Sequence, residues 1–341
     1  SQGAFAEAKP ISLKVGGYME QWVGFASYDP DNGTKVVDVD VQQDAEIIFS
    51  GSTTLDNGLT FGVNVQLEAE SDNGTGAQDT IDEAYLFFRG EFGEIVLGME
   101  NGPSYAMHYG FGDFGVGVTM NSGDLSQWYL APNAYQLSGT YQGLRHRDND
   151  SNKIRYISPR MSGFQIGASY SPEATQDDDG FPTEASNVGK PEQVWDVAAN
   201  YSNKLGDVNL AVSAGYQAIG DGNGATGQDP YNFGLGIRVG FSGFAVSASW
   251  THENDYGGTI VDRDVMGAGI NYKDGPMRVG MDVAYGKQDY VAAGTEETKQ
   301  ISVQLGGTYI LGPGVEARGS VYYASQQNGN GETGNDSKGF A

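Results

Sequence analysis

The side chains that could support catalysis in this chain are few. It has no cysteine and only three histidines, His108, His146 and His252, none of them spaced as a pair of zinc ligands. A zinc site or a thiolate nucleophile needs residue types or spacings that this sequence does not offer. We expect the histidines to lie in loops, and a hydrolase that uses a serine with one histidine is the remaining enzymatic alternative. The sequence therefore favours a protein that is not an enzyme.

Charged residues recur instead at alternate positions of extended segments, where one face of a strand would present them together. Charges on the wall of a water-filled channel act on passing ions and dipolar solutes. The basic positions are Lys14, Arg89, Arg155, Arg238, Arg278 and Arg318. The acidic positions are Glu20, Asp44, Glu46, Glu68, Glu83, Asp196, Asp282 and Glu316. The acidic excess predicts a preference for cations, and ion pairing within the wall is the alternative interpretation.

One long segment between extended runs, residues 101–152, could bring further charge into such a channel. Connections of about 4–6 residues are typical, so a much longer one indicates a functional loop. Its glycine-rich start suits tight turns and close packing. We expect it to fold inward as a constriction loop. Glu100, Asp113 and Asp124 would then line the narrowest part of the channel, and exposure to solvent is the alternative.

Two motif-like stretches give little support for ligand binding. Residues 110–115 match G-x-G-x-x-G, but no strand–helix–strand pattern surrounds them, so a nucleotide site is not predicted. A stretch that starts at Asp148 begins like a calcium loop, yet Lys153 and Pro159 stand where a glycine and a glutamate are needed. A looser Ca²⁺ site at Asp148 and Asp150 is a weak candidate, and no other metal or cofactor is expected.

The elements that must position these residues share one pattern, in which apolar residues alternate with polar or small ones until an aromatic residue ends the apolar series. A period of two gives a strand one apolar and one polar face, and tilted strands of about 9–11 residues cross a bilayer. Aromatic rings suit the headgroup layer. The pattern predicts a transmembrane β-barrel rather than a soluble all-β protein. The aromatic girdle would comprise Tyr170, Tyr201, Tyr216, Phe241, Trp250, Tyr272, Tyr285, Tyr309 and Tyr323.

We expect residues 1–341 to form a single barrel domain of antiparallel strands, with short periplasmic turns and long external loops. Fifteen strands are complete in the pattern, whereas single-chain bacterial barrels have even numbers. A sixteenth strand would begin at Lys338, after a loop over Ser325–Ser337, and we expect it to be truncated, with the chain continuing beyond it. Residues 1–8 are either the remnant of a signal peptide or an ordinary tail.

Composition narrows the class of protein further. The formal net charge is −25, and phosphate binding needs a basic surface, so nucleic acid is excluded as a partner. Mean hydropathy is −0.41 and no run of 18 apolar residues occurs, so helical membrane proteins are excluded as well. The lack of cysteine fits an exported chain.

Three stretches carry a resemblance to a known family: Ser12–Trp22, Asp82–Gly98 and Asn152–Pro172. Through them the chain resembles the Gram-negative general (diffusion) porins of the alphaproteobacterial type, over nearly its whole length. Many members have an arginine directly after the last glycine of the second stretch, where this chain has Met99 followed by Glu100.

The resemblance implies a sixteen-stranded barrel with an inward-folded third loop, placed in the bacterial outer membrane in contact with its lipid and lipopolysaccharide. It also implies a homotrimer that passes ions and small hydrophilic solutes by passive diffusion, and Ser71–Thr80 resembles the loop that joins neighbouring subunits. A channel selective for sugars or peptides is the alternative, and a structural protein without transport is a third class. In a selective channel the loop aromatics could stack on solutes, or they could fix the loop to the wall: Tyr105, Tyr109, Phe111, Phe114, Trp128 and Tyr129.

Overall fold

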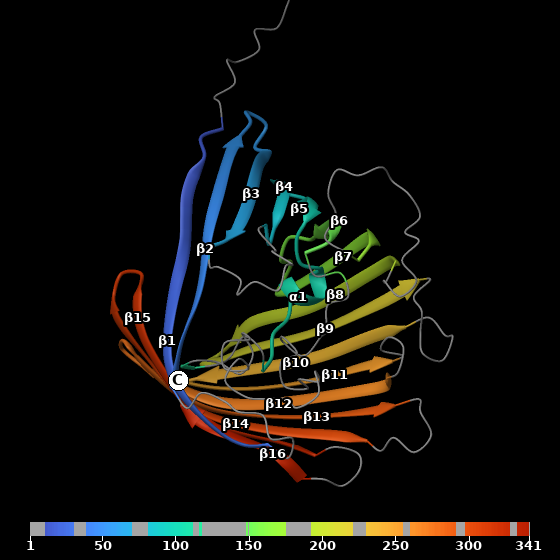
Figure 1. The fold of residues 1–341 in the computed structure, drawn as a ribbon. Helices are drawn as coiled ribbons and strands as arrows, with labels where there is room; N and C mark the ends of the chain where they lie inside the picture. Colours follow the sequence, from blue (N-terminus) through green and yellow to red (C-terminus); the bar gives the residue numbers. More distant parts are fainter. Residues whose placement is uncertain are drawn as a thin grey trace, which may run out of the picture.

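The chain forms one closed antiparallel sheet (Figure 1). A computed structural model describes residues 11–30, 39–69, 81–111, 116–117, 148, 150–174, 192–220, 230–254, 260–290, 297–327 and 333–340. Sixteen strands pair in sequence order, and β1 also pairs with β16, so that the sheet closes into a barrel. The predicted fold class is confirmed.

The strands vary in length, from six residues in β6 to seventeen in β1. The three shortest, β4, β5 and β6, are neighbours in the sheet. The bounds are β1 (Lys14–Pro30), β2 (Val39–Thr54), β3 (Thr60–Glu68), β4 (Ala84–Gly90), β5 (Gly93–Met99), β6 (Asn152–Ile157), β7 (Phe164–Glu173), β8 (Glu192–Leu205), β9 (Val208–Gly220), β10 (Tyr231–Phe241), β11 (Phe244–Asn254), β12 (Ile260–Asp274), β13 (Met277–Tyr290), β14 (Thr298–Gly312), β15 (Val315–Gln327) and β16 (Thr333–Phe340).

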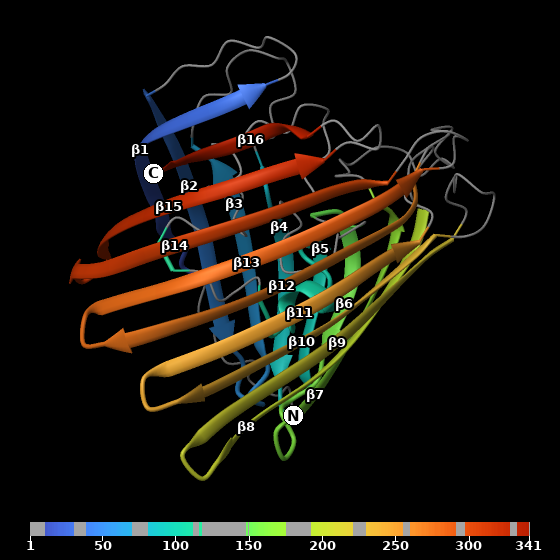
Figure 2. The ribbon, with the colours of Figure 1, turned by 90° about the horizontal axis from the view of Figure 1, so that it is seen from below.

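Tight hairpins lie at one end of the barrel, where Figure 2 shows β8–β9, β10–β11, β12–β13 and β14–β15 turning. Phe241 pairs with Phe244 across only Ser242 and Gly243, whose φ angles are 47° and 83°. Positive φ at both central positions is the type I′ geometry, whose twist matches that of the flanking strands. At the other end, β9 and β10 are separated by residues 221–230.

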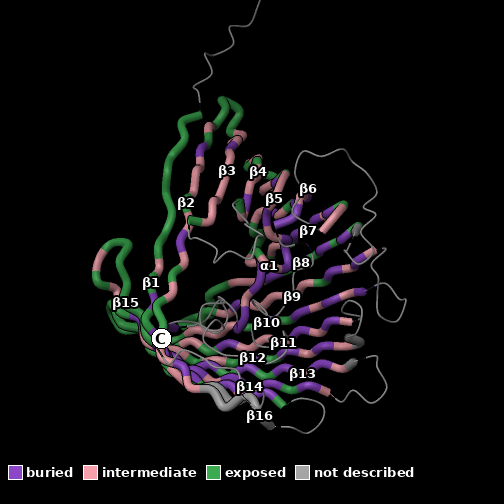
Figure 3. Tube along the Cα trace, viewed as in Figure 1, coloured by how far each residue is buried: buried purple, intermediate pink, exposed green. Residues whose placement is uncertain are grey.

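The burial of side chains is the reverse of that in a soluble protein. Along β14, polar Gln304 is 1% exposed, whereas its neighbour Leu305 is 58% exposed. The same alternation recurs on other strands (Figure 3). One face of the sheet is therefore an apolar outer surface for lipid, and the other is a polar inner wall.

The nine aromatic residues predicted as a girdle share the outward phase of these apolar residues, and strand direction sorts them into two rows. We call Tyr170, Tyr216, Trp250, Tyr285 and Tyr323 the loop-side girdle. We call Tyr201, Phe241, Tyr272 and Tyr309 the hairpin-side girdle. Aromatic rings on adjacent strands extend both rows: Trp195 contacts Tyr170 and Phe244 contacts Tyr272, each pair with centroids 4.6 Å apart.

The last strand differs from the sequence-based prediction. Strand β15 continues to Gln327 and β16 begins at Thr333, inside the range Ser325–Ser337 that was predicted as a loop. The start predicted at Lys338 was wrong, because the backbone of this polar segment pairs with β15 and β1 whatever its composition. Strand β16 meets β1 over Phe25–Pro30, and beyond this pairing Arg318 of β15 donates to Glu20 of β1 at 2.9 Å.

The described residues contain one short helix, α1 (Pro103–Ala106), which follows β5 and lies within the curve of the strands (Figure 1). Proline at the start of α1 suits the first turn of a helix. Among the described residues, no helix has the length and apolarity needed to cross a membrane.

Candidate pore-lining site

The connection between β5 and β6 is the third of the long ones along the chain, and we call it the third connection. Where the structure describes it, it lies against the inner wall. Helix α1 packs on β6 to β9. The backbone N–H and the hydroxyl of Ser104 both donate to the carboxylate of Asp196 on β8. Asn200 of β8 donates to the carbonyl of Met107 at 2.8 Å, and the N–H of Tyr109 donates to Ser213 of β9, also at 2.8 Å.

The same segment continues across the barrel to the opposite strands. The side chain of Phe111 is buried, beside Gly267 of β12. On β14, Gln304 donates to the carbonyl of Val116 at 2.9 Å, and the N–H of Gly117 donates to Thr308 at 3.0 Å. Residues 103–111 and 116–117 therefore follow the inner wall from β7 to β14.

The wall beneath this segment is a track of small residues. The first part of the track pairs in register across β9 to β12 and comprises Ser213, Gly236, Ser249 and Gly267. The second part pairs across β13 to β15 and comprises Gly280, Gly306 and Ser320. A Cβ atom at Gly236 or Gly306 would overlap the carbonyl oxygens of Tyr109 and Val116. Glycine is needed here because backbone approaches backbone. This track was not predicted from the sequence, although glycine recurs in the polar phase of successive strands.

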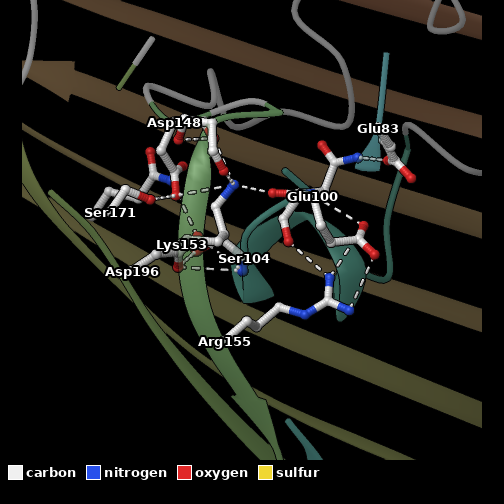
Figure 4. A network of polar contacts seen from close by, with 11 residues as sticks. Glu83, Glu100, Ser104, Asp148, Lys153, Arg155, Ser171 and Asp196 are labelled. Atoms are coloured by element: carbon white, nitrogen blue, oxygen red, sulfur yellow. Dashed lines mark hydrogen bonds and ion pairs between the residues drawn. The ribbon is translucent and has the colours of Figure 1, made fainter. Parts of the chain in front are cut away.

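Both ends of the third connection are held by one buried lysine (Figure 4). The ammonium of Lys153 donates to the carbonyl oxygens of Glu100 at the start, and of Asp148 and Ser151 at the end, the latter two at 2.8 Å. Three donors are all that an ammonium has. Lys153 is 3% exposed. We call these contacts the stem clasp.

A second cluster fixes the start of the third connection, where Arg155 lies between two carboxylates. Its guanidinium is 3.1 Å from Glu94 and 3.3 Å from Glu100, and it donates to the carbonyl of Asn101 at 2.7 Å. Asn101 in turn donates to Glu83 at 2.8 Å. Burial, followed by repulsion from Glu100, raises the pKa of Glu83 to about 8. Glu83 therefore stays largely protonated at neutral pH.

The calcium candidates Asp148 and Asp150 are both buried. The carboxylate of Asp148 accepts hydrogen bonds from Ser171 at 3.0 Å and from Gln217 at 2.9 Å, so its oxygens take part in holding the connection. Among the described residues, the acidic group compact enough for a cation lies elsewhere, at Glu46, Glu68 and Asp82.

That acidic group lies on and beside three neighbouring strands. Carboxylate oxygens of Glu46, Glu68 and Asp82, on and beside β2, β3 and β4, lie within 4.8 Å of one another, and all three side chains are partly exposed. Tyr18 of β1 donates to Glu46 at 3.0 Å and to Asp44 at 3.3 Å. These carboxylates gather on neighbouring strands, β2 to β4, whereas the small-residue track follows β9 to β15.

Several of the predicted basic wall residues are paired with carboxylates. Arg89 forms an ion pair with Glu94, and Arg318 is 2.9 Å from Glu20 and 3.2 Å from Glu316. The partial ion pairing considered as an alternative from the sequence is thus present. A row of basic and polar residues pairs in register across β12 to β15, namely Lys273, Arg278, Thr308 and Arg318. Inward positions on β10, β1 and β13 are occupied by Arg238, Lys14 and Asp282.

Of the histidines that the structure describes, one lies in the third connection and the other on a strand. His108 is buried in the third connection, and burial together with the charge of Arg238 lowers its pKa to about 4. His252 lies on β11, so its predicted loop position was wrong, because the strand extends past the girdle. Outside the described residues lie Asp113, Asp124, His146, Phe114, Trp128, Tyr129 and Ser71–Thr80.

Two of the described loop aromatics, Tyr109 and Phe111, contact other parts of the barrel. Phe111 is 4% exposed beside Gly267, and the hydroxyl of Tyr109 accepts from Arg160 at 3.2 Å. These contacts favour a role in fixing the connection over a free stacking surface for solutes.

A closed barrel with an apolar exterior, a polar interior and a connection laid along its inner wall defines an outer-membrane channel. The chain belongs to the Gram-negative porin family, whose sequence model matches residues 1–329. It is thus a porin channel of the bacterial outer membrane, and family and fold point to a channel rather than an enzyme. No curated protein matches its sequence.

Solved structures share the fold at low sequence identity. An anion-selective porin from Comamonas acidovorans has a TM-score of 0.63 and 16% identity, with 97% of this chain and 98% of that one covered. OmpT, an outer membrane protein of Vibrio cholerae, has a TM-score of 0.61 and 14% identity, with 98% of both chains covered. A mutant of the Rh. blastica porin has a TM-score of 0.55 and 17% identity, with 96% and 99% covered.

Proposed function

We propose that this porin is a passive diffusion channel for ions and small hydrophilic solutes, and that it prefers cations. Its narrow section would lie between the third connection and the acidic wall of β1 to β4. The observation that carries this proposal is the convergence of Glu46, Glu68 and Asp82, whose carboxylate oxygens lie within 4.8 Å of one another on and beside β2, β3 and β4.

Electrostatics supports this preference. Two wall arginines, Arg155 and Arg318, are each offset by two carboxylates at 2.9–3.3 Å, so their field is largely cancelled at a distance. Two unit charges about 4 Å apart interact by about 1 kcal/mol in water and about 4 kcal/mol at an effective dielectric constant of 20. A clustered group of carboxylates therefore enriches cations along its side of the passage.

The solved porin from Comamonas acidovorans is anion-selective, so the fold does not decide the sign of selectivity. At 16% identity that structure supports the architecture alone. In this chain the acidic residues outnumber the basic ones by 44 to 19.

The test is the reversal potential of the purified protein in a planar bilayer under a salt gradient. We expect a potential of the sign for cation permeation, which shifts toward zero in the triple variant Glu46→Gln, Glu68→Gln, Asp82→Asn. The control removes the same charge from the hairpin side, with Asp56→Asn, Asp207→Asn and Asp274→Asn. An anion-selective wild type, or equal shifts in both triple variants, would contradict the proposal.

We also propose that the chain assembles as a homotrimer and that Asp113 and Asp124, with Glu100, bear on the narrow section. A trimeric form of Vibrio cholerae OmpT supports the assembly by its similar fold. Conductance that closes in three equal steps is expected of a trimer, and single-step closure of every unit would count against it.

The carboxylates proposed for the narrow section are tested separately. Asparagine at Asp113 and Asp124 should reduce cation preference, and an unchanged reversal potential would remove both residues from the constriction.

A further inference from the structure

The charged residues that line the lumen near the hairpins are mostly basic. On each strand the side chains of one phase face inward: Arg278, for example, lies between Met277 and Val279, which are both exposed on the outer face. Within four residues of the strand ends on the hairpin side, the inward acidic residues are Glu94 and Glu316. The inward basic residues there, which we call the basic mouth, are Lys14, Arg89, Arg155, Lys204, Arg238, Lys273, Arg278 and Arg318.

Two residues of the basic mouth lack the ion pairs that other members of the set make. Lys273 and Arg278 pair in register at the β12–β13 hairpin, and both side chains are exposed. Among the residues that the structure describes, neither forms an ion pair with a carboxylate. Asp274 follows Lys273 but has the opposite, outward phase. A positive field therefore reaches the water at this end of the passage.

Charge of the opposite sign lies nearer the loops. Glu68 ends β3, and Asp82 precedes β4, both on the loop side. Glu46 pairs in register with Glu68, next to the outward Ile47, so both carboxylates have the inward phase. From Thr60 on the hairpin side to Glu68, β3 advances about 20 Å along the barrel axis, at about 3.4 Å per residue and a tilt of about 40°. The sign of the wall charge therefore changes along the passage.

A passage of this kind conducts differently in its two directions. Rings of carboxylates enrich cations and rings of basic residues enrich anions. A voltage that is positive on the loop side drives cations from the acidic zone and anions from the basic zone toward the middle, where both accumulate and carry more current. The opposite voltage draws both kinds of ion away from the middle, which is depleted, so less current flows.

The range of the two fields matches their separation. The Debye length is about 10 Å at 0.1 M salt, so two zones about 20 Å apart together cover the passage between them. At 1 M the Debye length is about 3 Å, and most of the passage then contains bulk electrolyte. The asymmetry of the current should therefore depend on salt.

We propose that this porin rectifies, conducting more current when its loop side is positive than when its hairpin side is positive at the same voltage. The inference rests on the proposed function, because the acidic group of Glu46, Glu68 and Asp82 supplies one of the two zones. In outer-membrane barrels the end with long connections faces outward. The favoured direction therefore carries cations into the periplasm and anions out of it.

The experiment records single channels of the full-length protein in a planar bilayer, with the same KCl concentration on both sides and voltages of both signs. We expect a current ratio of about 1.5 to 2 at 0.1 M KCl, and a ratio close to 1 at 1 M, where the wall charge is screened.

The orientation of each channel is assigned with a single cysteine. The chain has none, and a Cβ at Gly312, in the β14–β15 hairpin, meets no atom within 4 Å, so Gly312→Cys introduces one thiol at the hairpin side. A bulky maleimide added to one compartment after the recording lowers the current only of channels whose hairpin side faces that compartment.

The basic mouth is tested by the variant Lys273→Gln, Arg278→Gln. Its current ratio at 0.1 M KCl should fall close to 1, while the reversal potential under a salt gradient keeps the sign for cations. The control Lys287→Gln, Lys299→Gln removes two positive charges from outward positions of β13 and β14 and should keep the ratio of the wild type. Conductance at 1 M KCl shows that each variant is folded.

Four results would overturn the inference. These are equal currents of both signs at 0.1 M, a larger current with the hairpin side positive, a ratio that persists at 1 M, and equal effects of the two double variants. The proposed function is judged separately by the reversal potential. A cation-selective channel without rectification would reject this inference alone, whereas a rectifying channel that prefers anions would reject the cation preference alone.

Discussion

The ammonium of Lys153, a residue of β6, donates to the backbone carbonyl of Asp148 at 2.8 Å, and so holds the end of the third connection that lies just before β6. The same ammonium donates to Glu100, so the two ends of a long segment meet at one buried charge. The position of the third connection therefore depends on a residue that lies in the wall, outside the connection.

Replacing Lys153 by methionine should loosen the third connection. Methionine keeps most of the volume but leaves three carbonyl groups without their donor, and each unsatisfied buried group costs about 1–3 kcal/mol. We expect a lower unfolding temperature in heat-mobility gels and larger current fluctuations in single-channel recordings. Lys204→Met, at an exposed site at the end of β8, is the control. Quiet currents and an unchanged unfolding temperature would show that the clasp has no such role.

A disulfide should lock the third connection to the wall without changing the channel. The chain has no cysteine, and a Cβ at Gly267 lies against the side chain of Phe111, so Phe111→Cys with Gly267→Cys creates one pair at this contact. We expect the bond to form on mild oxidation, detected by mass spectrometry of peptides. Conductance should be the same before and after reduction, because the segment already lies there. Thiols that stay free under oxidation would place Phe111 away from β12.

Adjacent glycines on β14 offer a matched pair of substitutions. Valine at Gly306 would overlap the carbonyl of Val116 and displace the third connection into the lumen, so single-channel conductance should fall. Valine at Gly307 faces the opposite side, where the nearest atom is the Arg278 carbonyl oxygen at 3.8 Å, and should leave conductance unchanged. Equal conductance of the two variants would contradict the close approach of backbone to wall.

Cation preference should rise with pH because of Glu83. Its pKa is raised to about 8, so the carboxyl is mostly neutral at pH 7 and ionised at pH 9, which adds a negative charge beside Glu100. The same raised pKa gives a contribution to folding stability that is complete below the ordinary pKa of about 4.5 and is lost as pH rises through about 8.

Reversal potentials measured at pH 7 and pH 9 check this expectation, with Glu83→Gln as the comparison. The glutamine variant should show a smaller change between the two pH values. An identical pH response in wild type and variant would assign the titration to another group.

Most of the fold was predictable because alternation is a local property of the chain. The stretch Thr298–Gly312 alternates polar and apolar residues, and burial follows the same phase in the structure. Strand β16 was misplaced because its residues are polar and include glycine, whereas its conformation is set by pairing with β15 and β1.

The candidate site was less predictable, because its contacts join residues far apart in the sequence. Arg155 and Asp196 stand in the polar phase of β6 and β8, but their contacts depend on Glu100 and Ser104, which no local pattern brings to them. The small-residue track becomes visible only when the register of neighbouring strands is known. Ser213, Gly236 and Gly267 are unremarkable in sequence and adjacent in space.

The two aromatic girdles also act as a ruler for the membrane. On β13, Tyr285 stands in the loop-side girdle, and Met277, eight positions earlier, pairs with Tyr309 of the hairpin-side girdle. At about 3.4 Å per residue and a tilt of about 40°, this spacing corresponds to a hydrophobic thickness of about 20 Å. The bilayer that best matches this barrel is therefore thin, and lipids with long acyl chains would have to compress around it.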